Sequence, residues 1–497
     1  MPCKDLPVRR FFSILKLRAI DQLFEVENYE EVFEEVLFNS YEFIFIFMPV
    51  TVIVYFLLNR FRLIYASKLW LALSSLFFYC WWDVRYLPLL LGSIAFNYFM
   101  GRTISHMQNA TERKRKLALA FAIIMNLLLL IYYKYADFFI GNVNALFDTD
   151  VPLLKIVLPL GISFFTFTQI AYLVDAYRGK AKEYNVISYV LFVTFYPHLI
   201  AGPILHHKEM MPQFDRLRGK RFDYSNVAKG LFLLSIGLFK KVVIADSFAP
   251  VASNGFDVLS QLNFIQAWTT SLSYTLQLYY DFSGYSDMAI GVALLFNIIL
   301  PINFNSPYKS LNIQDFWRRW HMTLSRFLRE YIYFPLGGSR KGTTRTHINS
   351  MLTMLIGGLW HGAGWTFVFW GFMHGFAQFI HRIWQKANIK LPKWVAWFIT
   401  FQFINLTWVF FRATSWDNAI KVLKGMVGLN GIGIASLDKT IVLGLAVFMI
   451  VAVLCRNSMQ MLEGFKPGWK TAVFAAALFC IAVVYFNKIS EFLYFSF

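Results

Sequence analysis

The chain has 497 residues, of which 57% are hydrophobic, 19% aromatic and only 15% charged. Soluble globular proteins carry roughly a quarter charged residues and about half apolar ones. These numbers exclude a row of soluble domains, a disordered chain and a small disulfide scaffold. We therefore expect an all-α, multi-pass membrane protein.

The charge balance is strongly basic, with 47 Lys and Arg against 29 Asp and Glu, a net charge of +18. In a membrane protein this excess indicates basic loops kept on the cytoplasmic side, so we expect no nucleic-acid partner. The four cysteines include no C-x-x-C pair. They predict neither a disulfide framework nor a zinc site, and we expect no metal.

Residues 1–35 form an N-terminal extension that we separate from the membrane domain at 36–497. Within it, 6–20 carries Arg9, Arg10, Lys16 and Arg18 among Phe and Leu, as an amphipathic interfacial helix would. The apolar core and cleavage site of a signal peptide do not follow. We expect part of the extension to come from a start site upstream of the true one, and we assign it no function.

Apolar runs long enough to approach a bilayer span of about 20 residues recur along the whole membrane domain. Several are short or interrupted, so we predict about 11 spanning helices plus two or more re-entrant or interfacial segments. The runs are 41–58, 69–82, 86–100, 117–133, 156–177, 187–205, 230–245, 264–280, 288–300, 351–370, 372–384, 395–411, 441–455 and 471–486.

Loop charges predict the orientation. The first span follows an acidic stretch and is followed by Arg60 and Arg62, which places its end in the cytoplasm. Counting onward, 102–116 lies inside, 134–151 forms an outer loop and 178–182 returns inside. The run 187–205 has basic residues on both flanks and contains prolines, so we expect a re-entrant segment that protein covers.

The first chemical motif is GGLWHGAGW at 357–365, with His361 among small residues in an apolar stretch. One interpretation is helix packing, in which Gly358 and Gly362 form a G-x-x-x-G contact. The other is catalytic: glycines leave room for a substrate beside an imidazole that can take a proton near neutral pH. We favour the second, with Trp360 as a neighbouring substrate contact.

The second motif, at 315–329, is predicted to be one helix with two faces. Helical spacing separates an apolar stripe from a cationic one. The apolar stripe is Phe316, Trp320, Leu324, Phe327 and Tyr331, and the cationic stripe is Arg318, His321, Ser325 and Arg329. It is either an interfacial helix on lipid headgroups or a cytoplasmic mouth that holds an anionic acyl donor, with His321 toward the reaction path. The donor-binding candidates are Asp315, Trp317, Arg318, Arg319, Trp320, Ser325 and Arg329.

The third motif places Tyr280, Asp281 and Asp287 at an expected break between two apolar runs. The carboxylates either pair with nearby arginines as a structural lock or orient a histidine. Lys240 and Lys241 are expected to extend toward the membrane surface. The other histidines default to interface or loop positions; they are His106, His206, His207, His347, His374 and His381.

These motifs together resemble the membrane-bound O-acyltransferase (MBOAT) family, and more narrowly its alginate O-acetyltransferase branch. The similar segments are 158–179, 195–204, 278–291, 316–342 and 357–375, and the ends 37–47 and 492–497 also match that branch. The resemblance covers 36–497.

The resemblance implies a ring of tilted helices around a central tunnel in a bacterial plasma membrane. It implies that an acetyl group passes from a cytoplasmic donor, acetyl-CoA or another activated acetyl compound, to a hydroxyl of an alginate-like polysaccharide outside. His361 and His321 would be catalytic, with His361 as general base or transient acyl carrier. The resemblance implies no bound cofactor. It implies as partners an extracytoplasmic SGNH-type protein, a polysaccharide biosynthesis complex and membrane lipid.

Three alternatives remain at this stage. The same fold could acetylate peptidoglycan or transfer D-alanine to teichoic acid. A proton-coupled transporter would use His361 and the acidic pair as a relay, although no inverted repeat is apparent.

Overall fold

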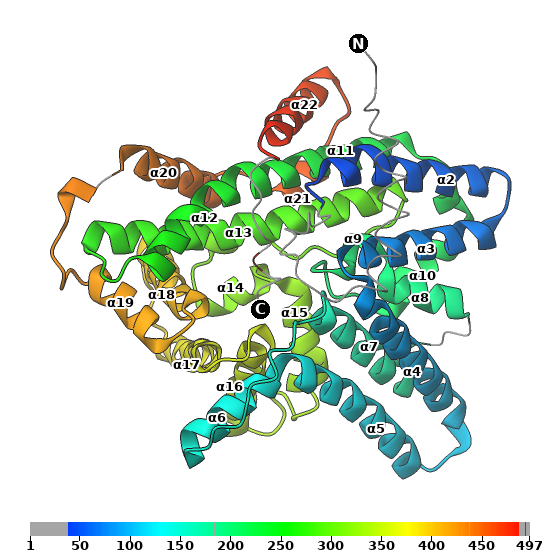
Figure 1. Ribbon diagram of the computed structural model, residues 1–497, viewed down its shortest axis with the longest axis horizontal. Helices are drawn as coiled ribbons and strands as arrows, with labels where there is room; N and C mark the ends of the chain where they lie inside the picture. Colours follow the sequence, from blue (N-terminus) through cyan, green and yellow to red (C-terminus); the bar gives the residue numbers. More distant parts are fainter. Residues whose placement is uncertain (1–37, 182–184, 437, 487–492, 494–497) are drawn as a thin grey trace.

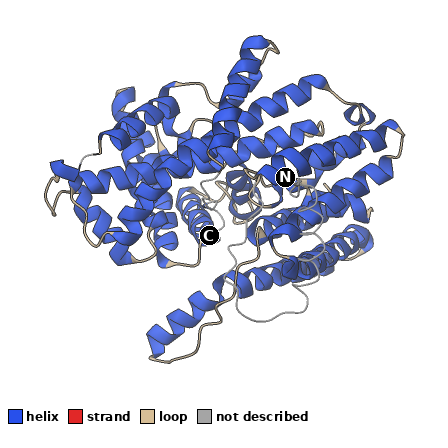
Figure 2. Ribbon diagram, turned by 45° about the horizontal axis from the view of Figure 1, so that its top comes forward, coloured by secondary structure: helices blue, strands red, loops and turns tan. Residues whose placement is uncertain are grey.

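The computed structural model describes residues 38–181, 185–436, 438–486 and 493, and every regular element in this part is a helix (Figure 2). The N-terminal extension lies outside the described residues, so the expectations for it are untested. The all-helical fold class is confirmed.

Most helices of the first half of the chain lie on the right side and upper edge of Figure 1, whereas α12 lies on the left and α6 at the lower left. Its α-helices are α2 (Met48–Arg60), α3 (Ile64–Trp82), α4 (Leu87–His106), α5 (Glu112–Leu130), α6 (Ala136–Phe147), α7 (Ile162–Tyr177), α8 (Val186–Thr194), α9 (Tyr196–Leu199), α10 (His207–Asp215), α11 (Tyr224–Leu238) and α12 (Asp246–Ser253).

The second half begins with the long helix α13 and continues through α14 and α15 near the middle of the view (Figure 1). Its α-helices are α13 (Phe264–Leu295), α14 (Ile313–Arg319), α15 (Met322–Leu328), α16 (Thr343–His361), α17 (Trp365–Ala387), α18 (Lys393–Arg412), α19 (Trp416–Met426), α20 (Lys439–Leu454), α21 (Ser458–Glu463) and α22 (Trp469–Val484).

Short π-helical and 3-10 turns extend or join these helices. The π-helical ones are η1 (Phe43–Phe47), η4 (Ile131–Tyr135), η6 (Phe239–Ala245), η7 (Asn254–Val258) and η9 (Arg329–Tyr333). The 3-10 ones are η2 (Val84–Tyr86), η3 (Met107–Asn109), η5 (Leu217–Lys220), η8 (Pro307–Lys309) and η10 (Ile434–Ser436).

Three described helical stretches are long and apolar enough to cross a bilayer, namely Phe43–Arg60, Glu112–Phe147 and Lys393–Arg412. Helices α20 and α22 are apolar but shorter. Helices α4, α7 and α13 each carry buried polar side chains, among them Asn97, Gln169 and Asp281. The expected number of about 11 spans therefore stays a prediction.

Three expected boundaries are wrong. The region 134–151 is not a loop, because α5 continues through η4 into α6. The runs 264–280 and 288–300 are not separated, because α13 is unbroken through Asp281 and Asp287. The runs 351–370 and 372–384 are not separate helices that meet at residue 371, because the turn between α16 and α17 lies at 362–364.

The break expected in 187–205 is confirmed: α8 ends at Thr194, and Pro197 lies in the first turn of α9. Residues 191–207 are all buried. Backbone that leaves a helix in this way needs protein around it in a membrane, which is the environment found here.

Helix α13 stays continuous because protein surrounds it, with all residues from Ser273 to Phe296 buried. Glycines bring its backbone against α11. A Cβ on Gly230 would lie 2.6 Å from the carbonyl oxygen of Gly291, and one on Gly237 would lie 2.6 Å from that of Gly284. Small residues at helix contacts are how membrane helices pack closely.

The α16–α17 hairpin depends on glycine in the same way. A Cβ on Gly371 would lie 2.5 Å from the Met354 carbonyl oxygen, whereas one on Gly357 would meet only the end of the Leu328 side chain at 3.2 Å. We expect Gly371→Ala to destabilise the purified protein by about 1–3 kcal/mol through overpacking. Gly357→Ala, the matched control, should unfold within a degree or so of wild type. Equal shifts in unfolding temperature for the two variants would contradict this account.

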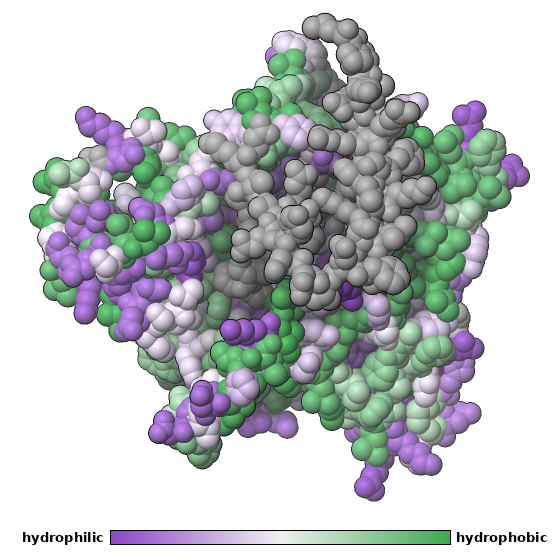
Figure 3. Space-filling view, in the orientation of Figure 1, coloured by the Kyte–Doolittle hydropathy of each residue, from purple (hydrophilic) through white to green (hydrophobic). Residues whose placement is uncertain are grey.

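The segments whose basic residues predict a cytoplasmic position lie beside one another. The Lys68 ammonium contacts Asp215 at 2.5 Å, Arg115 donates to the Tyr177 carbonyl at 2.6 Å, and Arg326 contacts Glu209 at 3.0 Å. On the predicted outer side, Trp365 donates to Asn142 at 2.8 Å. Figure 3 shows hydrophobic areas on the right side and in the lower middle of this face. The side of the membrane on which each group lies stays a prediction.

Candidate active site

His361 is the last residue of α16 and is 2% exposed. Its ring lies among aromatic rings, with centroid distances of 4.9 Å to Trp360, 5.2 Å to Trp370 and 5.0 Å to Phe411. The ring of His321 is 6.4 Å away. The two histidines singled out from the sequence therefore meet in one buried place, although 40 residues separate them.

His321 does not continue a helix, contrary to the prediction of one helix over 315–329. It adopts the left-handed conformation, with φ 42°, between α14 and α15, and its side chain is fully buried. This conformation is rare outside glycine and strained, and it is found preferentially at functional sites. The break turns His321 inward, whereas Arg318 and Arg329 remain exposed, so the expected cationic stripe does not include the histidine.

Asn303 fixes the orientation of the His321 ring. Its side-chain oxygen accepts the Thr323 backbone N–H at 3.2 Å and the Thr323 hydroxyl at 2.8 Å, so this atom is an acceptor. The His321 Nδ1 lies 3.1 Å from the same oxygen and must donate to it. In the neutral ring the proton is then on Nδ1, and Nε2 is the nitrogen that can accept a proton.

The tryptophans of the second motif belong to the protein core, not to a membrane interface. Trp320 is buried, with its ring 5.6 Å from Phe316 and 4.9 Å from Trp408. Trp317 donates its indole N–H to His374 Nδ1 at 3.2 Å. Among the three tryptophan candidates, Trp360 is the one whose ring contacts both histidines, at 4.9 Å from His361 and 5.9 Å from His321.

The remaining donor-binding candidates lie on α14 and α15 and at the start of η9, and the Ser325 backbone N–H donates to the His321 carbonyl at 3.0 Å. Asp315 and Arg319 form an ion pair of 2.9 Å, one helical turn apart. Ser325 donates its hydroxyl to the Trp320 carbonyl at 3.4 Å. A role of these residues and of the exposed arginines in holding a donor stays a prediction.

The two carboxylates of α13 form buried ion pairs that hold helices together. Their partners are lysines and not the expected arginines. Lys241 lies 2.9 Å from both Asp281 and Asp246, and Lys240 lies 2.6 Å from Asp287. The expectation that these lysines extend toward the membrane surface is wrong. Both lysines belong to the π-helical turn η6, and their side chains point toward α13. A buried lysine needs a carboxylate partner there, because burying an unpaired charge is costly. Tyr280 donates to the Phe448 carbonyl at 2.8 Å.

We expect Lys241→Met to destabilise the protein by about 3–5 kcal/mol, because it leaves two buried carboxylates without their cation. The triple variant Lys241→Met, Asp246→Asn, Asp281→Asn removes all three charges and should recover most of that loss. Thermal unfolding in detergent measures both. A triple variant as unstable as the single one would show that packing, and not charge, determines the effect.

Lys134 and Tyr135, which the sequence did not single out, hold the end of α16. Lys134 donates to the carbonyls of Trp360 at 2.7 Å and His361 at 3.2 Å, and Tyr135 donates to the Leu359 carbonyl at 2.5 Å. The last carbonyls of a helix lack partners within it, and a cation there also interacts favourably with the helix dipole. Both donors come from η4, so this turn caps the segment that ends in His361.

A cavity of about 280 Å³ opens beside this cap. Its wall includes Lys134, Asp137, Gly362, Ala363 and Phe367, and it therefore reaches the residue next to His361. The Asp137 carboxylate accepts the backbone N–H groups of Leu154 and Lys155 at 2.7 and 2.9 Å. These bonds hold the extended segment before α7 along one side of the cavity.

The membrane-bound O-acyltransferase family matches residues 76–416, more than two thirds of the chain. The chain belongs to this family. It is 48% identical to the peptidoglycan O-acetyltransferase of Helicobacter pylori, over 93% of this chain and 97% of that protein. It is 39% identical to the probable alginate O-acetylase AlgI of Azotobacter vinelandii, over 81% and 80% of the two chains. The teichoic acid D-alanyltransferase of Streptococcus thermophilus is 28% identical over 51% of this chain and 68% of that protein.

Membership in the MBOAT family makes this protein a multi-pass membrane O-acyltransferase. The resemblance inferred from the five internal motifs is thereby confirmed, and the transporter alternative is wrong. The relatives include proteins named for two different acetyl acceptors and one named for D-alanine transfer.

The structure of this MBOAT protein also corrects the view of two other histidines. His374 is fully buried, with its ring 4.5 Å from that of Trp370, which contacts His361. His206 is also buried, 3.5 Å from Asp175 and 2.9 Å from the Tyr331 hydroxyl. His374 lies inside α17, whereas His206 lies in the segment just before α10, as a buried loop residue. His374 lies on α17, the helix that follows the GGLWHGAGW motif. This closeness in sequence could have indicated that His374 lies near His361.

Proposed function

We propose that this protein moves an acetyl group from a cytoplasmic activated donor across the membrane for O-acetylation of peptidoglycan. The observation that carries the proposal is the buried pair of His361 and His321, 6.4 Å apart, at the end of a capped helix. The acceptor is proposed from the 48% identity with a peptidoglycan O-acetyltransferase over nearly the whole of both chains.

In the proposed reaction the acceptor hydroxyl transfers its proton to an imidazole nitrogen as its oxygen bonds to the acyl carbon. The bond from that carbon to the donor's leaving group, a thiolate for acetyl-CoA, then breaks, and the proton passes to the leaving group. His361 acts as this base, or it carries the acetyl group transiently as an acyl-imidazole. His321, with Nε2 as its basic nitrogen, is the second proton acceptor in reach.

The proposed donor is acetyl-CoA or another activated acetyl compound, with Arg318 and Arg329 attracting its negative charge at the cytoplasmic side. An SGNH-type extracytoplasmic protein that completes the transfer to the glycan is the proposed partner, within a cell-wall or polysaccharide biosynthesis complex. Isotopically labelled acetyl-CoA supplied to inside-out membrane vesicles tests the donor directly.

The acceptor is tested by mass analysis of muropeptides from cells with and without the gene, complemented by wild type or by His361→Gln. We expect alkali-labile acetyl groups to disappear from the glycan in the deletion strain and to return only with the wild-type gene. Unchanged muropeptides would overturn the peptidoglycan proposal.

An alginate-like exopolysaccharide is the second candidate, favoured by the 39% identity with a probable alginate O-acetylase. It is supported if acetyl is lost from secreted polysaccharide while muropeptides are unchanged. Loss of D-alanine esters from a surface polymer would instead support the activity for which the more distant relative is named.

A further inference from the structure

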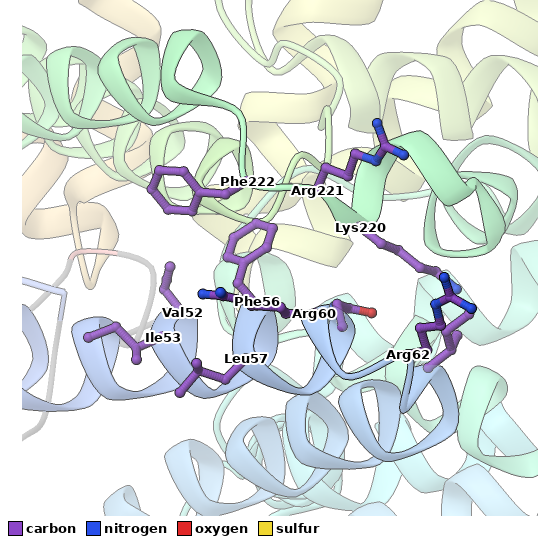
Figure 4. Close-up of a pocket in the computed structure, with 11 residues that line it drawn as sticks. Val52, Ile53, Phe56, Leu57, Arg60, Arg62, Lys220, Arg221 and Phe222 are labelled. Atoms are coloured by element: carbon purple, nitrogen blue, oxygen red, sulfur yellow. The ribbon is translucent and has the colours of Figure 1, made fainter.

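A cavity of about 800 Å³ lies between α2, the start of α3 and the segment that leads from η5 into α11. Its lining changes character from one end to the other (Figure 4). Val52, Ile53 and Leu57 lie toward one end, and Lys220 and Arg62 lie toward the other. Phe222 lies across from Val52 at the apolar end, and its ring centroid is 5.2 Å from that of Phe56.

The polar end of this cavity carries an uncompensated positive charge. Arg60, Arg62, Lys220 and Arg221 all line it, and no acidic side chain does. Among the described residues none of the four forms an ion pair with a carboxylate. The nearby Asp215 is already paired with Lys68 at 2.5 Å. Burial and the neighbouring Lys68 lower the pKa of Lys220, as expected where cations are crowded together.

The order of the apolar and charged ends of the cavity matches the order of acyl chains and headgroups in a membrane. The apolar stretch Phe43–Arg60 is long enough to span a bilayer and ends at the cations. Ile53, which is 57% exposed, and Leu57 face outward about two turns and one turn before that end, respectively. The cations therefore lie at headgroup level and the apolar wall at the level of the acyl chains.

We infer that this cavity binds an anionic phospholipid of the cytoplasmic leaflet. The phosphate lies by Arg62 and Lys220, with Arg60 and Arg221 as further cations of the same lining, and an acyl chain follows Val52, Ile53, Phe56 and Leu57 along α2. Charge complementarity favours an anionic headgroup over a zwitterionic one, since four cations stand without a carboxylate. The apolar wall favours a lipid over free phosphate, because burying it requires a chain.

The bound lipid would join two parts of the protein that are far apart in sequence. Phe56 of α2 and Phe222, before α11, touch directly across the cavity. The phosphate adds a second link, from Arg62 after α2 to Lys220 and Arg221. Binding to the folded state alone raises stability by RT ln(1 + c/Kd), where c is the lipid concentration, and therefore with the logarithm of c once c exceeds Kd. The inference concerns no acyl-transfer step and is independent of the proposed function.

The test titrates the full-length protein in detergent with phosphatidylglycerol, phosphatidylcholine or inorganic phosphate and follows the unfolding temperature. We expect phosphatidylglycerol alone to raise it, by less at high salt. Stabilisation by inorganic phosphate equal to that by phosphatidylglycerol would overturn the lipid site in favour of an anion site. Equal effects of the two lipids would overturn the role of the cations.

Charge variants locate the binding. Each removed cation should weaken phosphatidylglycerol binding about fivefold, so Arg62→Gln with Lys220→Gln should weaken it about 25-fold. The matched control is Arg113→Gln with Lys114→Gln, two exposed cations of another predicted cytoplasmic loop. Ile53→Ser, which keeps every charge, should also weaken lipid binding. Equal losses in the double variant and its control would show general surface attraction and overturn the site.

Discussion

Replacing His361 with glutamine should lower acetyl transfer by about 10²–10⁴-fold, the usual contribution of a general base. Glutamine nearly preserves the size of the side chain and its hydrogen bonding in the pocket formed with Trp370 and Phe411, but it takes no proton at neutral pH. Transfer from labelled acetyl-CoA, measured at equal membrane abundance of the variants, gives the rate.

His347→Gln is the matched control, because His347 lies on the same helix α16, 14 residues before His361, in contact with Phe379. It should transfer acetyl at close to the wild-type rate. If His361→Gln also does so, His361 is a packing residue. His321 then becomes the leading base, and His321→Gln should show the loss instead.

Lys134→Met should lower transfer by about 10²-fold, although Lys134 is not expected to touch the reacting atoms. Without its ammonium the carbonyls of Trp360 and His361 lose their donor, and the last turn of α16 is free to shift. A displacement of about 1 Å at a reacting group is enough for a loss of this size. The loss should appear in kcat with KM for the donor little changed.

Lys134→Arg keeps the charge and should restore part of the rate, which a purely steric effect would not. Modification of His361 by diethyl pyrocarbonate, followed by peptide mass analysis, reports its position without turnover. It should be faster in Lys134→Met than in wild type or in the exposed control Lys114→Met. Wild-type kcat together with wild-type modification in Lys134→Met would contradict a positioning role.

Local properties of the sequence determined much of the fold. The share of apolar residues identified a membrane protein, because no soluble surface can be made from so few charged residues. Pro197 marked a real helix break, since proline lacks the N–H that continues a helix. His361 could be singled out because a titratable group among glycines in an apolar run is costly unless it has a function. The identity of the catalytic residues remains a prediction that the geometry supports.

Other features were decided only by tertiary packing. A helical repeat placed His321 on an exposed stripe, but Asn303, 18 residues earlier, holds it in a left-handed turn that faces His361. The sequence around Asp281 suggested a break, whereas Lys241 and the surrounding helices keep α13 continuous. Nothing in the sequence indicated the role of Lys134, because its partners are backbone carbonyls more than 220 residues away. Pattern and composition report local preference and burial, but which distant backbone group satisfies a buried charge depends on how the helices pack.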